Sequence, residues 1–448
     1  MSGRFAGERA VVVGAGVAGT AAARALVAEG ASVLVTETRP DELVPSADEL
    51  RAAGADVRAG GHRPGHLDGA TLVVTAPGVP PDAEVVSWAE DRGLPIWGEM
   101  ELGARLATVP YVAVTGTNGK TTVTAMVEAC LRADGRDAVA CGNIGRSFPE
   151  AAREAHDVLV VEVSSFQLAR QESFHPFASV LLNVAPDHLD WHGDLEAYAA
   201  AKARIHALQA GEDVHVGNRD DPAAASISER ARCRVRWFRS GPPDVDEVGY
   251  EGEHLVARIA GQHRLGAIRG GPALREDAAA AAALALSIGV VPAAAAAALA
   301  TFRPAPHRGE EVAVVDGVRF VDDSKATNVH AALAAIRGVD DAVLIAGGRA
   351  KGADLSALRQ EAGRLRAVVA IGEAAPEVAA AFDGAVPTSF AGSIEEAVRE
   401  AFATAGPGGT VLLAPACASW DQFTDYAERG DRFAAAARSL VEEVTARG

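Results

Sequence analysis

The chain has 448 residues and a net charge of −18, because 60 acidic residues stand against 42 Lys and Arg. This balance argues against nucleic acid and membrane surfaces as partners. The length predicts about three domains at about 150 residues each. The four cysteines are widely separated, which argues against a zinc site or a disulfide framework and favours a reducing compartment. The first residues contain no apolar stretch of the signal-peptide type, so we expect no secretion signal.

Strands and helices are predicted to alternate over the first hundred residues. We expect a helix at 20–29 and strands at 10–13, 32–36 and 71–75, a βαβ pattern that implies a parallel sheet. The turn before the helix reads GAGVAG from Gly14 to Gly19, and Glu37 follows the second strand. This pattern is typical of dinucleotide binding, with Glu37 on a ribose. A simple tight turn and a pyrophosphate site for another nucleotide are the alternatives. We favour the pyrophosphate site because a second nucleotide motif follows.

Residues 112–122 read VAVTGTNGKTT, an apolar strand that runs into a Gly-rich turn. Such a turn lets backbone N–H groups converge on phosphate oxygens, and the next helix adds its positive N-terminal dipole. Lys120 can reach the β- and γ-phosphates, and Thr121 can ligate Mg²⁺. The usual pattern has a glycine where this chain has Val114, so the loop is a variant. We favour binding of ATP or GTP over a purely structural turn.

Polar residues also follow the next strands, which are expected at 158–162 and 180–183. Glu162 ends the first strand, and His188 comes soon after the second. Because parallel strands end at a common edge, a carboxylate and an imidazole beside the P-loop suit a divalent cation. A structural histidine is the alternative. Lys202 lies in a helical pattern over 196–208 and is interpreted, from the residues alone, as a solvated surface lysine.

Two further segments precede the last part of the chain. Residues 239–253 are polar and are expected to form surface loops or short antiparallel strands. Residues 278–302 carry no charge and are long enough for a membrane span. They are mostly alanine, however, with Pro292 in the middle. We therefore expect two packed helices of a soluble protein, broken at Pro292.

A third series of strands and helices follows a proline-rich linker at 303–306. Its strands are expected at 318–321, 342–346, 367–371 and 410–413. Three of the strands lead into loops with basic or hydroxyl side chains, at 322–328, 347–354 and 414–423. Each loop alone could be a turn or a helix cap. Three such loops at one sheet edge suggest a wall that binds carboxylates.

The chain is thus predicted to be an α/β protein of three consecutive domains, at residues 1–105, 106–303 and 304–448. The first and last domains are expected to be Rossmann-like, and the central domain to be a P-loop-type ATPase. The sequence contains no repeat of fixed period.

Five segments together resemble the Mur ligase family, the ATP-dependent amide-bond ligases of peptidoglycan precursor synthesis. They are TGTNGKTT (115–122), GNIG (142–145), VEVSSFQL (161–168), DDSKATN (322–328) and PACASWDQFTDYAERGDRF (415–433). The first is shared with other Mur ligases and with folylpolyglutamate synthetases. The other four resemble more specifically the members that add D-glutamate. The resemblance covers nearly the whole chain.

The resemblance implies a reaction. The first domain would bind the UDP moiety of UDP-N-acetylmuramoyl-L-alanine, the central domain ATP and Mg²⁺, and the last domain D-glutamate. The γ-phosphate of ATP would pass to the acceptor carboxylate, and the amine of D-glutamate would attack the acyl phosphate. A related ligase that adds L-glutamate or another amino acid is the alternative. We expect a cytoplasmic monomer with neither nucleic acid nor membrane as a partner.

The family motifs imply roles for residues at matching positions. The catalytic residues would be Lys120, His188 and Lys202. The ATP contacts would be Gly116, Thr117, Asn118, Gly119, Lys120, Thr121, Thr122, Asp277, Arg308 and Asp323. The metal ligands would be Thr121, Glu162, His188 and a carbamylated Lys202, which reverses the interpretation of Lys202 as solvated. The UDP-substrate contacts would be Val17, Ala18, Thr38, Arg39, Gly78 and Asn143. The amino-acid contacts would be Lys325, Thr327, Lys351, Ser419 and Tyr426.

The chain departs from the family pattern in two places. GPALRED at 271–277 stands where a His-Asn-x-x-Asn segment contributes to adenine binding, and Asp277 is the polar residue at the last Asn position. Ala18 and Ala76 stand where hydroxyl residues are frequent in the UDP pocket. Two other functions stay open: a dinucleotide-dependent oxidoreductase, because of the first Gly-rich turn, and a non-catalytic ATP-binding regulator, because of the altered adenine segment.

Overall fold

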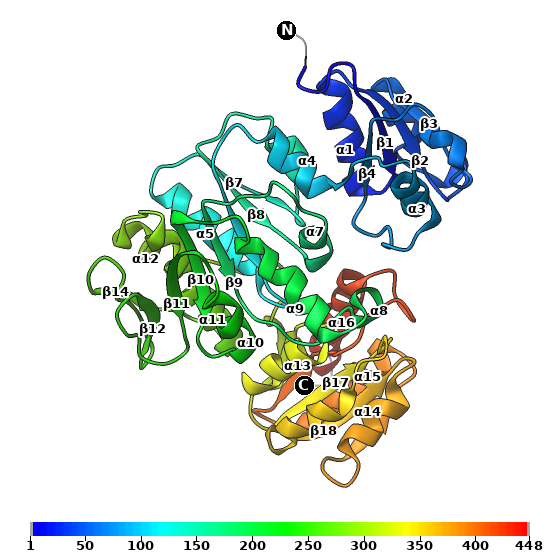
Figure 1. The fold of residues 1–448 in the computed structure, drawn as a ribbon. Coiled ribbons are helices and arrows are strands. Elements are labelled where there is room, and N and C mark those ends of the chain that lie inside the picture. The colour runs from blue at the N-terminus through cyan, green and yellow to red at the C-terminus, as the bar shows by residue number, and fades with distance from the viewer. Residues whose placement is uncertain (1–2, 446–448) are drawn as a thin grey trace. The chain divides into compact units, whose positions relative to one another are not determined.

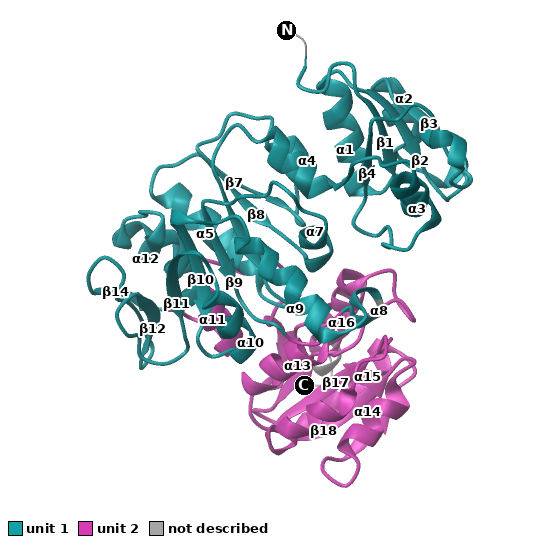
Figure 2. Ribbon diagram, in the orientation of Figure 1, with its two compact units in different colours: residues 1–184, 188–267, 278–301 teal, residues 185–187, 268–277, 302–448 magenta. Residues whose placement is uncertain are grey.

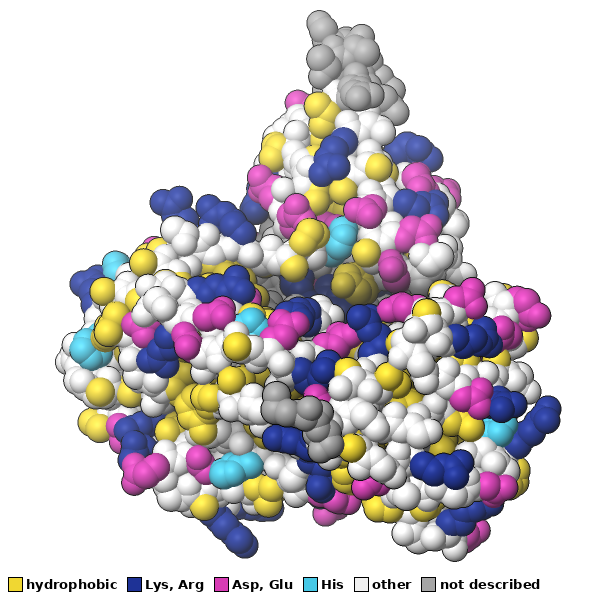
Figure 3. All heavy atoms as spheres, turned by 90° about the horizontal axis from the view of Figure 1, so that it is seen from above, with side chains coloured by type: hydrophobic (Ala, Val, Ile, Leu, Met, Phe, Trp, Pro, Cys, Tyr) yellow, Lys and Arg dark blue, Asp and Glu magenta, His cyan; other side chains and the backbone are white. Residues whose placement is uncertain are grey.

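The computed structural model describes residues 3–445, which divide into two compact units. Unit 1 holds the described residues up to 184, with 188–267 and 278–301 (Figures 1 and 2). Unit 2 holds 185–187, 268–277 and the described residues from 302 onward. On the face that Figure 3 shows, basic and acidic side chains are interspersed. In the described part of the chain, no helix combines the length and the apolar character that crossing a membrane requires.

Five parallel strands form the first sheet of unit 1, in the order β3-β2-β1-β4-β5. The strands are β1 (Arg9–Val13), β2 (Ser32–Thr36), β3 (Asp56–Arg58), β4 (Leu72–Thr75) and β5 (Ile96–Gly98). The helices are α1 (Val17–Ala28), η1 (Asp41–Leu43), α2 (Ala47–Ala52), η2 (Pro64–Leu67), α3 (Glu84–Asp91) and α4 (Glu99–Leu106). Because β1 pairs with both β2 and β4, the winding reverses at β1, where open α/β sheets bind ligands.

The Gly-rich turn between β1 and α1 lies at this switch point. A Cβ at Gly19 would lie 1.9 Å from the Gly14 carbonyl oxygen, so a side chain there would collide with the backbone. Gly14 has a φ of 93°, which favours glycine. The sequence of the turn is therefore required by its tight backbone whether or not a nucleotide binds.

Nine strands form the second sheet of unit 1, in the order β14-β13-β12-β11-β10-β9-β6-β8-β7. The strands are β6 (Tyr111–Thr115), β7 (Ala138–Gly142), β8 (Val158–Glu162), β9 (Ala178–Leu181), β10 (Gly211–Asn218), β11 (Cys233–Phe238), β12 (Glu247–Glu251), β13 (His254–Ala257) and β14 (His263–Ala267). The helices are α5 (Lys120–Ala133), α6 (Phe148–Ala151), α7 (Ser165–Ala169), α8 (Leu189–His192), α9 (Leu195–Ala203), η3 (Arg204–His206), α10 (Pro222–Ser228), α11 (Pro272–Ser287, in unit 1 from residue 278) and α12 (Pro292–Thr301).

Strand β6 is parallel to its neighbours β8 and β9. Val112 pairs with Val160 on one side and with Ala178 on the other, and all five residues of β6 are buried. The turns after these three strands therefore leave the sheet at one edge. They carry the P-loop, Glu162 and His188, so the sheet itself gathers the residues predicted to bind nucleotide and metal.

Unit 2 contains a six-stranded sheet in the order β15-β16-β20-β17-β18-β19, in which only β15 is antiparallel to its neighbour. The strands are β15 (Glu310–Val315), β16 (Val318–Asp322), β17 (Ala342–Gly347), β18 (Leu365–Ile371), β19 (Thr388–Phe390) and β20 (Thr410–Leu413). The helices are α13 (Val329–Arg337), η4 (Leu355–Arg364), α14 (Ala375–Phe382), α15 (Ile394–Ala405) and α16 (Tyr426–Thr445). Strands β16, β20 and β17 are parallel neighbours, so the prediction of three polar loops at one sheet edge is confirmed.

The α/β fold class is confirmed, and the strands predicted at 32–36, 158–162 and 410–413 have these bounds. The break at Pro292 between two helices is also confirmed. One expectation was wrong in part, because the strand expected at 180–183 ends at Leu181. Of the two alternatives for 239–253, the short antiparallel strand is confirmed, since β12 lies there and pairs antiparallel with β13. Predicted domain boundaries stay a prediction.

A polar group of side chains is buried beneath β9 and β10. His215 is fully buried, with Nδ1 2.8 Å from Ser179 Oγ and Nε2 2.9 Å from Ser228 Oγ. The His206 ring lies 4.6 Å away, centroid to centroid. Burial, with a smaller contribution from His206, lowers the pKa of His215 well below its usual value. The folded chain therefore holds this ring in its neutral form.

Acid should destabilise the fold through His215. The unfolded chain takes up a proton near pH 6.5 that the folded chain does not, so the free energy of unfolding falls as pH drops below that value, by up to about 1.4 kcal/mol per pH unit. Urea unfolding at about pH 7.5 and about pH 5.5 should show a larger loss for the wild type than for His215→Gln. His263→Gln, in the half-exposed strand β14, is the control. Equal losses in wild type and His215→Gln would contradict this expectation.

Candidate active site

The P-loop turn lies between β6 and α5. Gly119 has a left-handed φ of 84° and is the N-cap of α5. At Gly116, a Cβ would lie 2.8 Å from the Leu182 Cβ, so a side chain there would collide with the neighbouring loop. The two glycines let the backbone fold closely over the start of the helix, which is how N–H groups come to face phosphate oxygens.

Asn183 shapes this turn from the loop after β9. Its Oδ1 accepts hydrogen bonds from the N–H groups of Thr117, at 3.0 Å, and Asn118, at 2.9 Å. Sequence reasoning placed Asn183 in a strand and gave it no role. The short polar side chain directly after an apolar strand, beside a P-loop strand, was the available signal.

Two lysines meet at the Gly116 carbonyl oxygen. Lys120 Nζ donates to this oxygen at 2.9 Å and to the Thr117 carbonyl at 2.8 Å. Lys202 Nζ donates to the same Gly116 oxygen at 2.7 Å and is only 1% exposed. Tyr198, one turn earlier on α9, lies with its hydroxyl 3.0 Å from Thr117 Oγ1. The interpretation of Lys202 as a solvated lysine is therefore wrong, because this face of α9 packs against the P-loop.

Glu162, the last residue of β8, is 2% exposed. Asn143 holds it in place, since Asn143 Nδ2 donates to Oε1 at 2.8 Å and Asn143 N donates to the Glu162 carbonyl at 2.9 Å. The buried Oε2 has no hydrogen-bond partner within residues 3–445. A buried carboxylate oxygen without a donor is costly, and a cation would stabilise it. The predicted role of Glu162 as a metal ligand fits this geometry.

His188 has a left-handed backbone with a φ of 53° and is the N-cap of α8. Its ring packs against Phe166, with 4.7 Å between the ring centroids. A bulky residue rarely adopts this conformation, and residues that do so are frequent at functional sites. The histidine is thus held rigidly at the edge where the P-loop and Glu162 also lie.

The residues present suit a Mg²⁺ ion that is bound together with a nucleotide better than a metal ion held by protein side chains alone. Glu162 offers a buried oxygen, and Thr121 lies half-buried in the first turn of α5. Within the part of the chain that the structure describes, no three His, Cys, Asp or Glu side chains form a metal cluster. Mg²⁺ usually keeps several waters and binds one or two carboxylates together with phosphate oxygens. The sparse protein ligands therefore suit a magnesium–nucleotide complex.

Glu37 closes the Gly-rich turn of the first sheet. Its buried carboxylate accepts hydrogen bonds from Ala15 N at 2.8 Å, from Arg39 Nη2 at 2.9 Å and from Thr38 Oγ1 at 3.0 Å. Burial alone would raise the pKa of Glu37, but these donors outweigh it and lower the pKa to about 2. Because the carboxylate already holds the turn, the geometry weighs against Glu37 as a ribose ligand and against the dinucleotide alternative.

Most of the residues predicted to contact UDP surround the same turn, whereas Asn143 lies after β7, beside Glu162. Val17, the first residue of α1, is 85% exposed, and Ala18 is half-buried behind it. Gly78 is exposed in the loop after β4, while Thr38 and Arg39 are held by Glu37. An exposed apolar side chain at a helix N-terminus provides a surface on which a planar base can stack.

Asp322 and Asp323 follow one another at the end of β16 in unit 2. Asp322 Oδ2 lies 2.7 Å from His307 Nδ1, and Oδ1 accepts from Ser324 N at 2.9 Å. Asp323 is half-buried, and burial raises its pKa to about 7, against the opposing charge of Arg308. Asp322 is thus committed to the fold, whereas Asp323 suits the predicted contact with a ribose hydroxyl.

The predicted amino-acid contacts lie on the three loops of unit 2. Lys325 Nζ lies 3.8 Å from the centroid of the Tyr426 ring, and Lys351 Nζ lies 5.0 Å from that of Trp420. Ser419 is buried, and the Thr327 N–H donates to the Lys325 carbonyl at 2.8 Å. Both cations thus lie over aromatic faces, which restricts where they point.

Arg429 on α16 was missed by sequence reasoning, although it lies within a quoted motif. It is fully buried, and its guanidinium donates to Ser324 Oγ at 2.9 Å, to the Ser324 carbonyl at 2.8 Å and to the Cys417 carbonyl at 3.1 Å. Burial lowers the pKa of Arg429 to about 10. One arginine therefore fixes the loops that carry Lys325 and Ser419.

The predicted residues fall into three groups. Unit 1 brings the P-loop, Lys202, Glu162, Asn143 and His188 to one edge of its second sheet, and the predicted UDP contacts other than Asn143 to the switch point of its first. Unit 2 holds the amino-acid contacts with Asp277, Arg308 and Asp323.

Comparison with known proteins matches three family domains along the chain. Three domain models match: "Mur ligase MurD-like, N-terminal domain" over residues 8–98, "Mur ligase middle domain" over 114–244, and "Mur ligase, glutamate ligase domain" over 307–417. A solved structure of MurF ligase from Thermotoga maritima in complex with ADP shares the fold, with a TM-score of 0.62, 17% identity, and coverage of 92% of this chain and 95% of that one.

The chain belongs to the Mur ligase family, whose members are ATP-dependent ligases. Two relatives specify the branch. UDP-N-acetylmuramoylalanine--D-glutamate ligase of Frankia casuarinae is 48% identical over 97% of this chain and 95% of its own. The ligase of that name from Thermobifida fusca is 44% identical over 97% of this chain and 99% of its own. The resemblance to the Mur ligases is confirmed.

Arg429→Lys should raise the KM for the incoming amino acid about tenfold while the KM for ATP changes little, because lysine keeps the charge but cannot bridge two loops. We expect the free energy of unfolding to fall by about 2 kcal/mol. Arg432→Lys, at an exposed ion pair with Glu395, is the matched control. Steady-state kinetics and urea unfolding give both readouts. An equal rise of both KM values would mean that Arg429 does not act on the amino-acid loops in particular.

Proposed function

We propose that the protein is an ADP-forming ligase that adds D-glutamate to UDP-N-acetylmuramoyl-L-alanine in peptidoglycan precursor synthesis. The observation that carries the proposal is the pair of lysines on one P-loop carbonyl oxygen. Lys120 and Lys202 both donate to the Gly116 carbonyl, at 2.9 and 2.7 Å. Two cations held at one P-loop turn attract anionic groups of a ligand. A triphosphate and an acceptor carboxylate supply such anions.

The same crowding supports carbamylation of Lys202. CO₂ added to its amine would replace one of two adjacent positive charges by a negative one. The carbamate would then be a further oxygen ligand beside Glu162, whose Oε2 has no donor within the described chain. Mg²⁺ bound there would neutralise phosphate charge during transfer. His188, held rigidly at the same edge, would be a further metal ligand.

The chemistry proceeds in two steps. An acceptor carboxylate oxygen attacks the γ-phosphorus, and ADP leaves with the electrons of the broken P–O bond. The neutral amine of D-glutamate then attacks the acyl carbon, and inorganic phosphate leaves with that former carboxylate oxygen. Lys120 stabilises the negative charge of the transferring group. Lys325 and Lys351 attract the carboxylates of D-glutamate, with Thr327, Ser419 and Tyr426 around them.

The nucleotide and the UDP-substrate have separate binding sites in this proposal. ATP contacts come from residues 116–122 with Asp277, Arg308 and Asp323, and UDP contacts from Val17, Ala18, Thr38, Arg39, Gly78 and Asn143. The enzyme would act as a monomer in the cytoplasm, where ATP and UDP-linked precursors occur together. Addition of L-glutamate or another amino acid is the alternative.

Phosphate release from ATP should require both UDP-N-acetylmuramoyl-L-alanine and D-glutamate, and L-glutamate should be a poor substitute. With ¹⁸O in the acceptor carboxylate, label should appear in the released phosphate, because that oxygen leaves with phosphorus. Mass spectrometry of phosphate and product checks both points. Lys120→Ala, lacking the phosphate contact, is the control for contaminating activity. Turnover without acceptor, or phosphate without label, would refute the proposal.

Lys202→Ala should lower kcat at least about 100-fold, because the loss removes electrostatic stabilisation at the transferring phosphate. Short carboxylates such as acetate or formate should restore part of the activity, since they can replace a carbamate but not an ammonium. The matched control is Lys120→Ala, which short carboxylates should not restore. Rescue by methylamine and not by carboxylates would indicate that Lys202 acts as a cation. Activity against carboxylate concentration is the measurement.

A further inference from the structure

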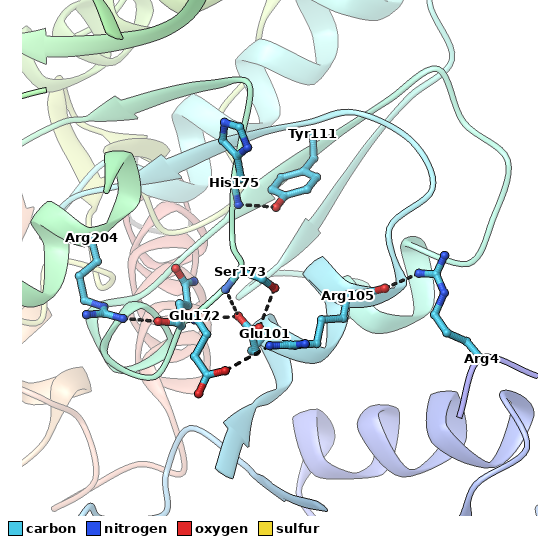
Figure 4. A network of polar contacts seen from close by, with 9 residues as sticks. Arg4, Glu101, Arg105, Tyr111, Glu172, Ser173, His175 and Arg204 are labelled. Atoms are coloured by element: carbon cyan, nitrogen blue, oxygen red, sulfur yellow. Dashed lines mark hydrogen bonds and ion pairs between the residues drawn. The ribbon is translucent and has the colours of Figure 1, made fainter. Parts of the chain in front are cut away.

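Helix α4 carries two buried glutamates, two residues apart, in contrasting surroundings. Glu101 accepts hydrogen bonds from Ser173 N at 2.9 Å, Ser173 Oγ at 2.6 Å, Glu172 N at 2.9 Å and Arg105 Nε at 2.6 Å (Figure 4). These donors outweigh burial, so the pKa of Glu101 is lowered. Glu101 therefore anchors α4 firmly to the loop after α7, and its carboxylate needs no further partner.

Glu99, the first residue of α4, lacks this compensation. It is 3% exposed, and its Oε1 accepts one hydrogen bond, from Gln167 Nε2 at 2.5 Å. Its Oε2 is buried without a hydrogen-bond partner in the described chain. Burial raises the pKa of Glu99 to about 7, because this bond and the nearby backbone groups only partly offset the loss of water. Since Glu101 fixes α4, the side chain has little freedom to seek another partner.

A small cavity of about 10 Å³ lies against Glu99. Its wall is formed by Thr75–Pro77 and Val79 of the loop after β4, by Phe166, Gln167 and Arg170 at α7, and by Trp191 of α8. The Trp191 indole N–H is also buried and has no acceptor within residues 3–445. A space of this size holds one oxygen atom. Two of the residues that line it, Glu99 and Trp191, each have a buried polar atom without a hydrogen-bond partner in the described chain, and Arg170 adds a cation to the wall.

We propose that this cavity is a subsite for a single hydroxyl group of the acceptor's sugar, which donates to Glu99 Oε2 and accepts from the Trp191 indole N–H. A hydroxyl is a donor and an acceptor on one atom, so it satisfies both groups. A carbonyl would leave the Glu99 carboxylate without a donor.

The position of the cavity between the predicted UDP contacts and the P-loop supports a hydroxyl of the acceptor's sugar. This step rests on the proposed function. The loop at Thr75–Val79 contains Gly78, predicted to contact UDP, and Ala76 packs beside the Gly-rich turn, 3.2 Å from where a Gly14 Cβ would lie. Helix α7 follows Glu162, at the edge that holds the P-loop. An acceptor that reaches from the first turn to the P-loop places its sugar between its diphosphate and its carboxylate.

Glu99 also connects this cavity to the site of phosphoryl transfer. Gln167, which donates to Glu99, uses its Oε1 to accept from Ser164 N at 2.8 Å and closes the capping box of α7. Ser164 lies two residues after Glu162. The carboxyl group therefore has one oxygen committed to the turn beyond Glu162 and the other available to substrate.

The test uses the full-length enzyme with Trp191→Phe and Glu99→Gln. Phenylalanine keeps an aromatic ring but removes the N–H donor with part of the indole, and glutamine keeps the bond with Gln167 while replacing the acceptor by an NH₂ group. Each variant should raise the KM for UDP-N-acetylmuramoyl-L-alanine about 3- to 10-fold, with the KM for ATP and D-glutamate unchanged. Assays at about pH 8.5 keep the Glu99 carboxylate ionised. Trp237→Phe, on β11 under Arg219, is the matched control and should not change any KM.

Acceptors that lack one sugar hydroxyl identify the bound group. With the acceptor that lacks the bound hydroxyl, the KM of the wild type should rise about 3- to 10-fold, which is about the effect of one hydrogen bond. The KM of Trp191→Phe should be no higher for this deoxy acceptor than for the complete acceptor. If every deoxy acceptor is affected equally by the variants, or if neither variant changes the acceptor KM, the cavity holds only a water and the subsite is refuted. Calorimetry of acceptor binding separates this result from failure of the proposed function, because it needs no turnover. Absence of acceptor binding to the wild type would overturn both.

Discussion

The Gly116 carbonyl oxygen of the P-loop accepts from two lysines, and this shared contact ties α9 to the turn at the edge of the second sheet. Lys120 comes from the P-loop helix and Lys202 from α9, so the two charges are brought together only by folding. Hydrogen bonds from neighbouring side chains stabilise this arrangement. Asn183 fixes the N–H groups of the turn, and Tyr198 bonds to Thr117 on the same face as Lys202. Glu162, with its unpartnered oxygen, places negative charge at the same edge.

The contrast between structural and available carboxylates runs through the whole chain. Glu37, Glu101 and Asp322 are satisfied by donors from their own surroundings and hold turns or helices in place. Glu162 and Glu99 each keep a buried oxygen without a donor. Natural folds rarely leave buried polar atoms unsatisfied, so such atoms indicate where a ligand completes the structure. Both of these lie at turns between a strand and a helix, beside the P-loop edge or the loop after β4.

Local motifs carried most of what could be predicted. The P-loop, the Gly-rich turn and the strand ends bearing Glu162 and the DDSKATN loop are contiguous in sequence, so their chemistry and position can be read together. Lys202 and Arg429 could not be understood in this way. Nothing in its neighbours shows that Lys202 is buried, because its burial depends on how α9 packs against a loop 86 residues away. Arg429 likewise bonds to Ser324, 105 residues earlier. The Glu99 cavity depends on four separate segments and has no sequence signature.

The hydrogen bonds of Lys120 have a consequence for which anions the turn can capture. Its ammonium already donates to two carbonyls of its own loop, at 2.9 and 2.8 Å. An incoming anion must compete with both contacts, so a lone phosphate or sulfate gains little by entering. A nucleoside triphosphate with its metal makes several contacts along the turn, which compensate for the hydrogen bonds of Lys120 that it replaces. The loop thus favours ligands that make several contacts with it at once.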